Sequence, residues 1–357
     1  MAEWSRVVNT TIHNYIRQEE INILRNRKLT AMLKEKGRIT FNASGDLLDW
    51  KVRYKRAPIQ GTTGYGTLTF AARDRWKTAQ LGWRGYAGTD QIQKIDRLKN
   101  KSTEAIINVY SQIATSLLDD IEDQYGDEFY VDGNASGNED RIHGLESFLG
   151  TSGAASGGYI GTPSDTYAGL STGLAGYGGS WSGDWPTGTG DAHYDFWSPV
   201  IVDYTDTAWA ASTKTWPNTC LEALRFGIIK SKKNKSKKGM LDLILLNDEL
   251  YRQFLDKLQT EEQINVNRGA TSGLIAAGFQ DVTNFDGVDV TSEYGVPTTV
   301  GYGVSLMQME LRSLQGQMFV PEGPDFDIAA QSYRFSIDFY GNLRCNPRHM
   351  VKFDNIT

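Results

Sequence analysis

A long segment without glycine or proline, residues 89–125, most constrains the fold of this 357-residue chain. Its apolar side chains recur at steps of three and four, which is the spacing of one helix face. Thr89 followed by Asp90 is typical of a helix start. The pattern predicts one helix of roughly 35 residues, about 50 Å long, which is longer than a small domain is wide. The apolar positions are Ile106, Tyr110, Ile113, Leu117 and Ile121.

The residues before this segment alternate as β-strands do. Between Lys51 and Arg56, basic side chains lie on one face and apolar ones on the other, and residues 67–70 alternate after a glycine-rich turn. We expect a long two-stranded hairpin over residues 45–86. Since an isolated hairpin is marginal in water, it needs another surface to lie on. The candidate intersubunit residues on it are Lys51, Arg53, Lys55, Arg56, Tyr65 and Trp76.

The charge is distributed unevenly along the chain. Residues 1–101 hold 20 Lys and Arg against 9 Asp and Glu (+11), and the remaining residues hold 17 against 34 (−17), which together give the net charge of −6. A basic third on an acidic body is typical of a nucleic-acid binder or of a subunit whose basic arm lies on an acidic neighbour. The acidic total favours the second interpretation.

Shorter patterns complete an α+β chain with two compact lobes. The alternation from Tyr333 to Phe339, followed by Gly341 and Asn342, predicts a C-terminal hairpin. Other predicted elements are helices over residues 8–36, ended by Gly37, and over 219–229; strands over 200–202, over 241–246 and around Val288 and Val290; and a helix capped by Asn247.

Residues 133–190 hold 16 of the 37 glycines. Such a composition is typical of a flexible loop, but the segment and its C-terminal flank carry too many aromatic rings for a solvated linker. We interpret it as an extended, ordered loop held at an interface by those rings. They are Tyr167, Tyr177, Trp181, Trp185, Tyr194 and Trp197, of which Tyr177, Trp181 and Trp185 are the candidate interface residues.

Six lysines lie within nine residues after the predicted helix 219–229. A solvated loop explains such a run. Two functional explanations stand beside it: a patch that neutralises DNA phosphates without sequence preference, and a docking site for an acidic neighbour. The candidate basic loop consists of Lys230, Lys232, Lys233, Lys235, Lys237 and Lys238.

The sequence offers little catalytic chemistry. The nucleophile-elbow, P-loop, zinc-protease and Cys-x-x-Cys motifs do not occur, so we expect no enzyme activity and no cofactor. Asp191, His193 and Asp195 would share one strand face and are the best metal candidates, although surface polar residues explain them as well. Cys220 and Cys345 suit a reducing compartment, and no apolar run approaches the roughly 20 residues of a membrane span.

The order of these parts resembles the major capsid proteins of tailed bacteriophages, which have the Hong Kong 97-type capsid fold. The shared parts are an N-terminal arm, an extended β-hairpin (the E-loop), a long spine helix, a peripheral domain and an axial domain. The stretches that resemble pieces of this family run from Asn26 to Arg38, from Asp49 to Arg56, from His143 to Phe148 and from Tyr333 to Arg348.

The resemblance implies a structural protein that self-assembles into hexamers and pentamers of an icosahedral shell around double-stranded DNA. It implies as partners further copies, a portal protein, separate scaffolding and cement proteins and the enclosed DNA, with no membrane. The location implied is a virion capsid assembled in the host cytoplasm. The implied divisions are an arm (1–44), the hairpin (45–86), a peripheral domain with spine helix and glycine-rich loop (87–238), an axial domain (239–326) and a C-terminal return to the peripheral domain (327–357).

Three alternatives stay open from the sequence. An encapsulin has the same fold but encloses protein cargo. A secreted-type carbohydrate-binding or hydrolytic protein would suit the Trp, Tyr and Gly content, but it leaves the long helix and the basic hairpin unexplained. A general nucleic-acid binder built around the lysine run would lose affinity steeply with salt.

Overall fold

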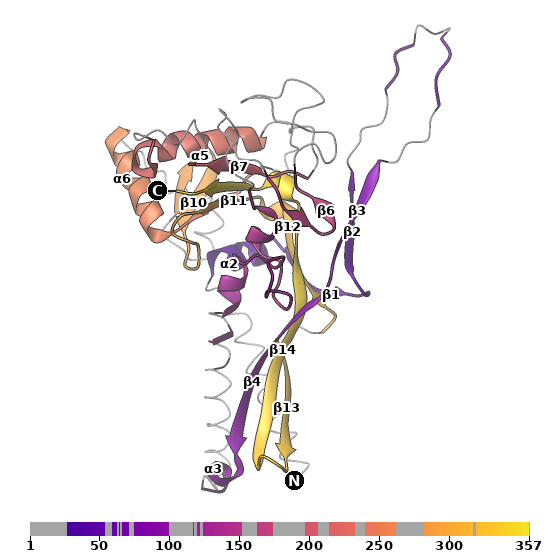
Figure 1. The fold of residues 1–357 in the computed structure, drawn as a ribbon, viewed down its shortest axis with the longest axis vertical. Helices are drawn as coiled ribbons and strands as arrows, with labels where there is room; N and C mark the ends of the chain where they lie inside the picture. Colours follow the sequence, from indigo (N-terminus) through magenta and orange to yellow (C-terminus); the bar gives the residue numbers. More distant parts are fainter. Residues whose placement is uncertain are drawn as a thin grey trace.

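The computed structural model describes residues 27–53, 59–62, 64, 66–70, 75–99, 117, 120–121, 124–151, 163–173, 197–205, 214–232, 240–261, 282–316 and 319–356. In this part of the chain two large sheets meet in a body (Figure 1). A shaft of long strands leaves the body in one direction and a β-hairpin leaves it in another. No helix among the described residues is both long enough and apolar enough to cross a membrane.

The shaft is built on one strand, β14 (Ser332–Cys345), which is 14 residues long. A second strand pairs with it antiparallel along one edge from the shaft tip to the body, and two shorter strands share its other edge. One sheet therefore runs through both the shaft and the body. The partners are β4 (Arg84–Gln93), β13 (Val320–Asp327), β12 (Met309–Leu314) and, parallel to β12, β1 (Ile39–Ala43).

The second sheet has six strands in the order β7-β15-β11-β8-β10-β9. Helices pack on one face and the interior of the body on the other. In β8 (Leu243–Leu246), Ile244 and Leu246 pack in the core on the helix side of the sheet, whereas Leu243 and Leu245 pack in the core on its other side. Both faces of β8 are therefore buried, which explains its continuous apolar sequence. The elements are β7 (Val200–Asp203), α5 (Trp216–Lys232), β8 (Leu243–Leu246), α6 (Asp248–Glu261), β9 (Val282–Phe285), β10 (Val288–Ser292), β11 (Gly301–Val304) and β15 (Val351–Asp354).

This sheet does not follow the predicted domain boundaries at residues 239 and 327. β7 and α5 precede the first boundary and β15 follows the second, yet β15 pairs with both β7 and β11. The resemblance implied these divisions, and pairing between strands far apart in the chain leaves no local pattern in the sequence that would have shown the difference.

The predicted hairpin is present, with a different return strand. β2 (Leu48–Arg53) pairs antiparallel with β3 (Trp76–Leu81). Residues 67–70 are exposed and form no strand. The smaller elements are α2 (Lys28–Glu35), α3 (Lys94–Lys99), β5 (Thr166–Tyr167), β6 (Leu170–Ser171) and the 3-10 turns η1 (Leu145–Phe148), η4 (Leu306–Gln308) and η5 (Pro347–His349).

The prediction of a helix that starts at residue 89 is wrong. Residues 84–93 form β4, which pairs with β14 as far as Gln93 opposite Ser332, and α3 begins only at Lys94. Pairing with β14 gives the backbone N–H and C=O groups around Thr89 hydrogen-bond partners in a neighbouring strand, so they need none within a helix. The side chain of Ile92, on the same strand, is buried. Residues 124–128 are helical, while residues 100–116 of the predicted helix lie outside the described part.

The predicted C-terminal hairpin is also wrong, because β14 continues straight through Gly341 and Asn342. At Gly341 an added Cβ would lie 2.5 Å from the ring of Phe339 and 2.6 Å from the carbonyl oxygen of Arg312. The Asn342 side chain is buried and donates to the carbonyl oxygen of Gly82 at 2.8 Å. A glycine and an asparagine that suggested a turn therefore serve close packing inside a strand.

Other local predictions are confirmed. α2 ends at Glu35 and Gly37 follows with φ +63°, the left-handed conformation that ends many helices. Asn247 caps α6, since its side-chain oxygen accepts the backbone N–H of Glu249 at 3.1 Å. The strands predicted at 200–202 and 241–246 and the pair around Val288 are present, and the helix predicted at 219–229 is longer at both ends.

Replacing Gly341 by Ala is expected to lower the free energy of unfolding of the unassembled chain by about 1–3 kcal/mol, because the methyl group overpacks the Phe339–Arg312 contact. Urea denaturation followed by tryptophan fluorescence measures this. Gly82→Ala is the control, since no atom lies within 4 Å of its added Cβ, and its effect should stay within about 0.5 kcal/mol. Equal effects of the two substitutions would contradict the packing argument.

Candidate assembly surfaces

The base of the hairpin packs on its own body. Leu48, Trp50 and Val52 are buried on one face of β2, and the indole of Trp50 lies 6.4 Å from the rings of both Tyr167 and Trp197. The hairpin therefore shares the core of the body at this end, where its own chain provides the supporting surface that an isolated hairpin needs. Lys51 and Arg53 alternate with these residues and are exposed.

The outer part of the hairpin has no such support among the described residues. Ile59 is 96% exposed and Phe70 is 90% exposed, and Leu68 is about half exposed. The side chain of Gln60 donates to the carbonyl oxygen of Thr69 at 2.7 Å and accepts its N–H at 3.0 Å, which holds the two arms together. Large apolar side chains kept in water on an ordered arm are typical of a surface that another molecule covers.

The residues predicted to lie at interfaces differ in where the structure places them, and many of them lie outside its described part. Trp76 is about half exposed on β3, and its intersubunit contact stays a prediction. Lys230 is buried within α5, with its Nζ 5.4 Å from the centre of the Phe226 ring, so it is not part of an exposed basic loop. Lys232 is the last residue of α5. The predicted residues outside the described part are Lys55, Arg56, Tyr65, Tyr177, Trp181, Trp185, Asp191, His193, Tyr194, Asp195, Lys233, Lys235, Lys237 and Lys238.

Two rings from the aromatic-rich segment belong to the core instead of an interface. Tyr167 and Trp197 are fully buried and stack on each other with ring centres 6.1 Å apart. The Tyr167 hydroxyl donates to the carbonyl oxygen of Leu343 at 2.8 Å and accepts the N–H of Cys345 at 3.0 Å. Burial raises the pKa of this hydroxyl well above its ordinary value. The pair thus attaches the hairpin base to the body end of β14.

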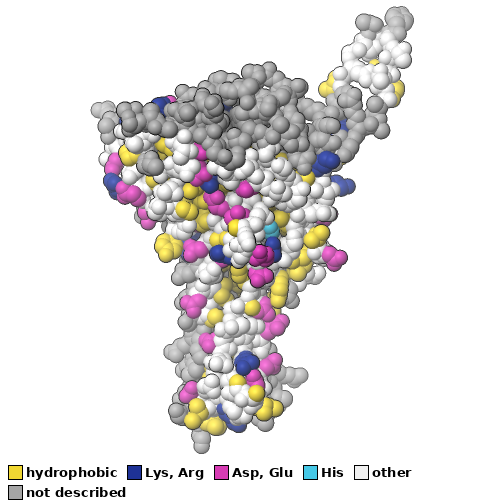
Figure 2. All heavy atoms as spheres, in the orientation of Figure 1, with side chains coloured by type: hydrophobic (Ala, Val, Ile, Leu, Met, Phe, Trp, Pro, Cys, Tyr) yellow, Lys and Arg dark blue, Asp and Glu magenta, His cyan; other side chains and the backbone are white. Residues whose placement is uncertain are grey.

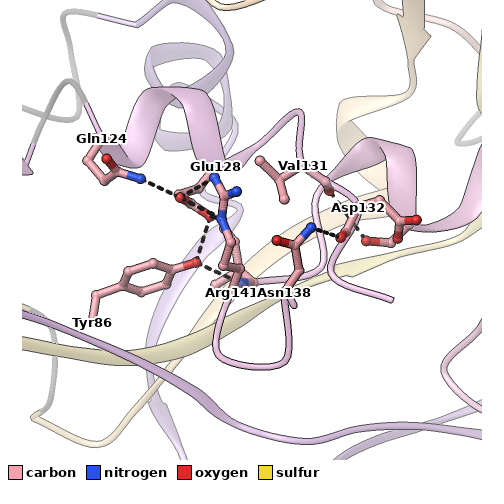
Figure 3. Close-up of polar contacts among 9 residues, drawn as sticks. Tyr86, Gln124, Glu128, Val131, Asp132, Asn138 and Arg141 are labelled. Atoms are coloured by element: carbon pink, nitrogen blue, oxygen red, sulfur yellow. Dashed lines mark hydrogen bonds and ion pairs between the residues drawn. The ribbon is translucent and has the colours of Figure 1, made fainter. Parts of the chain in front are cut away.

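A buried carboxylate joins the shaft to the body (Figure 3). Glu128 accepts hydrogen bonds from both Nε and Nη2 of Arg141 at 2.6–3.0 Å, from Gln124 Nε2 at 2.6 Å and from the Tyr86 hydroxyl at 2.8 Å. The Tyr86 hydroxyl also accepts the N–H of Ile142 at 2.6 Å. The hydrogen bond to Glu128 raises the pKa of Arg141. Sequence reasoning missed this cluster, because its members come from three separate segments.

A second buried carboxylate attaches the N-terminal helix. Glu293 follows β10 and accepts the N–H of Leu29 in the first turn of α2 at 3.0 Å. Burial raises the pKa of Glu293 from its ordinary 4.5 to about 7, although Leu29, Arg27 and Lys28 act in the opposite direction. Lys28 also donates to the carbonyl oxygen of Ser292 at 2.6 Å. The helix thus depends on a residue 264 positions away for its cap.

No group of three or more His, Cys, Asp or Glu side chains that could hold a metal ion occurs among the described residues. His143, the described histidine nearest the core, is buried and its Nδ1 lies 3.0 Å from Asn342 Nδ2. Burial and the charge of Arg84 lower the pKa of His143 to about 4. It is therefore neutral near pH 7 and acts as a packing residue.

No protein-family model and no curated protein matches this sequence. Solved structures do match. A chain of the cyanophage A-1(L) capsid asymmetric unit is 16% identical, with a TM-score of 0.55 over 92% of this chain and 93% of that one. The chain has a phage capsid fold. A chain of the empty GTA particle's capsid (TM-score 0.54, 10% identity, 90% and 89% covered) and one of the native particle's capsid (0.50, 11%, 91% and 90%) agree. The resemblance seen in the sequence is confirmed at the level of the fold.

Removing the cation of the Glu128 cluster is expected to be costly in this capsid fold. Arg141→Met should lower the free energy of unfolding by about 3 kcal/mol, because it leaves the Glu128 carboxylate, 1% exposed, without its guanidinium partner. Arg252→Met is the control: its pairs with Glu249 and Asp256 are more than half exposed, so about 0.5 kcal/mol is expected. Urea denaturation measures both, and similar losses would show that Glu128 does not depend on Arg141.

Glu293 should make the stability pH-dependent. Between about pH 4.5 and pH 7 the folded chain keeps the proton that the unfolded chain has lost, so the free energy of unfolding should fall as the pH rises through this window, by up to about 3 kcal/mol. Glu293→Gln keeps an oxygen for the Leu29 N–H but does not titrate, and it should remove this part of the slope. Urea midpoints at several pH values measure the difference; identical slopes in the two proteins would refute the assignment.

Proposed function

We propose that the chain is the major capsid protein of a tailed phage and assembles into hexamers and pentamers of an icosahedral shell around double-stranded DNA. The observation that carries the proposal is the phage capsid fold over about nine tenths of the chain. The exposed outer hairpin supports it, because Ile59 and Phe70 lie in water until another subunit covers them.

In this proposal each part of the fold has a role in the shell. The hairpin, the E-loop, extends over a neighbouring subunit. The shaft of β4, β13 and β14 forms the peripheral domain, with the described helical residues 117, 120, 121 and 124–128 as the end of a spine helix. The six-stranded sheet with α5 and α6 forms the axial domain at the capsomer centre, and it includes segments on both sides of residues 239–326.

The proposed role is structural and not enzymatic. The candidate partners are further copies of this chain, a portal protein, separate scaffolding and cement proteins and the enclosed DNA. Assembly in the host cytoplasm gives a virion capsid. An encapsulin-type shell is the rival within the same fold, and the contents of the particle separate the two: nucleic acid supports the phage capsid, and protein cargo supports the encapsulin.

Purified chain examined by negative-stain electron microscopy after size-exclusion chromatography should form particles, capsomers or tubes of uniform wall thickness. The variant Ile59→Ser/Phe70→Ser should fold normally but form about tenfold fewer particles, because it removes apolar area that the neighbour would bury. Ile59→Leu/Phe70→Leu keeps that area and should assemble. A wild-type chain that stays monomeric at all concentrations, with and without a phage scaffolding protein, would overturn the proposal.

A further inference from the structure

A concentration of positive charge that the shell function leaves unexplained lies beside the base of the hairpin. A groove of about 340 Å³ runs between β2 and the body end of β14, and its volume falls in the range of small-molecule sites. Figure 2 shows Lys and Arg side chains at the base of the hairpin. Among the described residues, the charged side chains that line the groove are Arg38, Lys51, Arg53, Glu310, Arg344 and Arg348.

The cations come from both walls of the groove. Lys51 and Arg53 stand two positions apart on the exposed face of β2, which places them about 7 Å apart along one wall. The other wall carries Arg38, just before β1, with Arg344 at the end of β14 and Arg348 in the turn η5. An anion in the groove would therefore lie between cations of the hairpin and cations of the body.

The carboxylate in the groove offsets only part of this charge. Glu310 is buried and accepts hydrogen bonds from Arg312 and Arg344, both at 3.1 Å. The charge of Arg38 also acts on it, so one carboxylate stands among three guanidinium groups. Burial, together with the neighbouring charge of Arg312, lowers the pKa of Arg344, which is the effect that crowded cations have on one another.

Two of the guanidinium groups are held in place by the protein itself. Nε and Nη2 of Arg38 donate to the carbonyl oxygens of Met309 and Met307 at 3.0 Å and 2.9 Å. The guanidinium of Arg344 lies 5.2 Å from the centre of the Trp50 ring. The Arg344 side chain is still 30% exposed, so a ligand can reach it. Cations that are already positioned lose little conformational entropy when a ligand binds.

The chemistry of the groove favours phosphate oxygens on a small molecule. Guanidinium groups bind such oxygens through paired N–H donors, and an excess of cations suits an anion with several charges. A short phosphate chain meets both requirements. A DNA duplex is a poorer match, because its major groove alone is about 12 Å wide and a cleft of about 340 Å³ is too small to admit a duplex.

We propose that the groove between β2 and the body end of β14 binds a small polyanion of the phosphate class, and that the bound anion ties the base of the hairpin to the body. Lys51 and Arg53 contact the anion from one wall, and Arg38 and Arg344 contact it from the other. The proposal goes beyond the shell function and does not depend on it, because all of these residues belong to one chain.

Isothermal titration calorimetry of the purified full-length chain with inorganic triphosphate tests the site, at low ionic strength because salt screens the attraction. The wild type should bind one equivalent. Lys51→Gln/Arg53→Gln should raise the Kd at least about tenfold, since it removes both cations of one wall; both side chains are exposed, so the variant should fold. Lys51→Arg/Arg53→Lys keeps the charge and should restore most of the affinity.

The matched control is Lys94→Gln/Arg252→Gln, which removes the same net charge at exposed positions outside the groove. This control should bind triphosphate as the wild type does. Thermal unfolding gives a second readout, because a ligand that binds only the folded chain stabilises it. Saturating triphosphate should raise the Tm of the wild type and of the control more than that of Lys51→Gln/Arg53→Gln.

Four results would overturn the proposal. The first is a wild type that does not bind triphosphate, and the second is equal weakening in the groove variant and the control, which would mean unspecific attraction. The third is inorganic phosphate that binds as tightly as triphosphate, since the site would then take a single phosphate group. The fourth is a short DNA duplex that displaces triphosphate at an equal concentration of phosphate groups. None of these results depends on whether the chain forms particles, so the shell function is tested separately.

Discussion

The shape of the molecule depends on the uninterrupted pairing of β14. This strand is hydrogen-bonded to β4 along one edge and to β13 and then β12 along the other, so the shaft and the body cannot rotate independently without breaking a ladder. Its body end is further fixed from the side, where the Asn342 amide contacts His143 and the Tyr167 hydroxyl bridges Leu343 and Cys345. A rigid connection of this kind fixes the position of the shaft relative to the body.

The hairpin is divided between two environments. Its base is part of the subunit core through Trp50, and its outer half exposes Ile59 and Phe70. The base needs no partner to be ordered, which limits the conformational entropy that the proposed contact of the outer half with another subunit would cost. An arm that is anchored at one end and unburied at the other is suited to a subunit that folds first and assembles afterwards.

Two buried carboxylates hold segments together by different means. Glu128 stays beside a guanidinium and links the shaft to the body, while Glu293 caps α2 in a place where burial raises its pKa to about 7. Neither is marked by a motif in the sequence. A buried carboxylate becomes recognisable only when its partners are known, and here those partners lie 13 and 264 residues away.

The sequence alone determined the local elements whose signals are short-range: the end of α2 at Gly37, the cap of α6 at Asn247, the alternation of β2 and the apolar run of β8. The order of the predicted parts also indicated the capsid fold, although the helix start at residue 89 and the C-terminal hairpin in that order were wrong. The tertiary structure decided what long-range pairing controls. Thr89 became part of a strand because β14 offered its backbone a partner, and Gly341 and Asn342 stayed in a strand because Phe339, Arg312 and Gly82 pack against them. The free energy of a residue's own helix or turn propensity is smaller than that of strand pairing and core packing. Strand pairing and core packing form only when segments distant in the sequence come together.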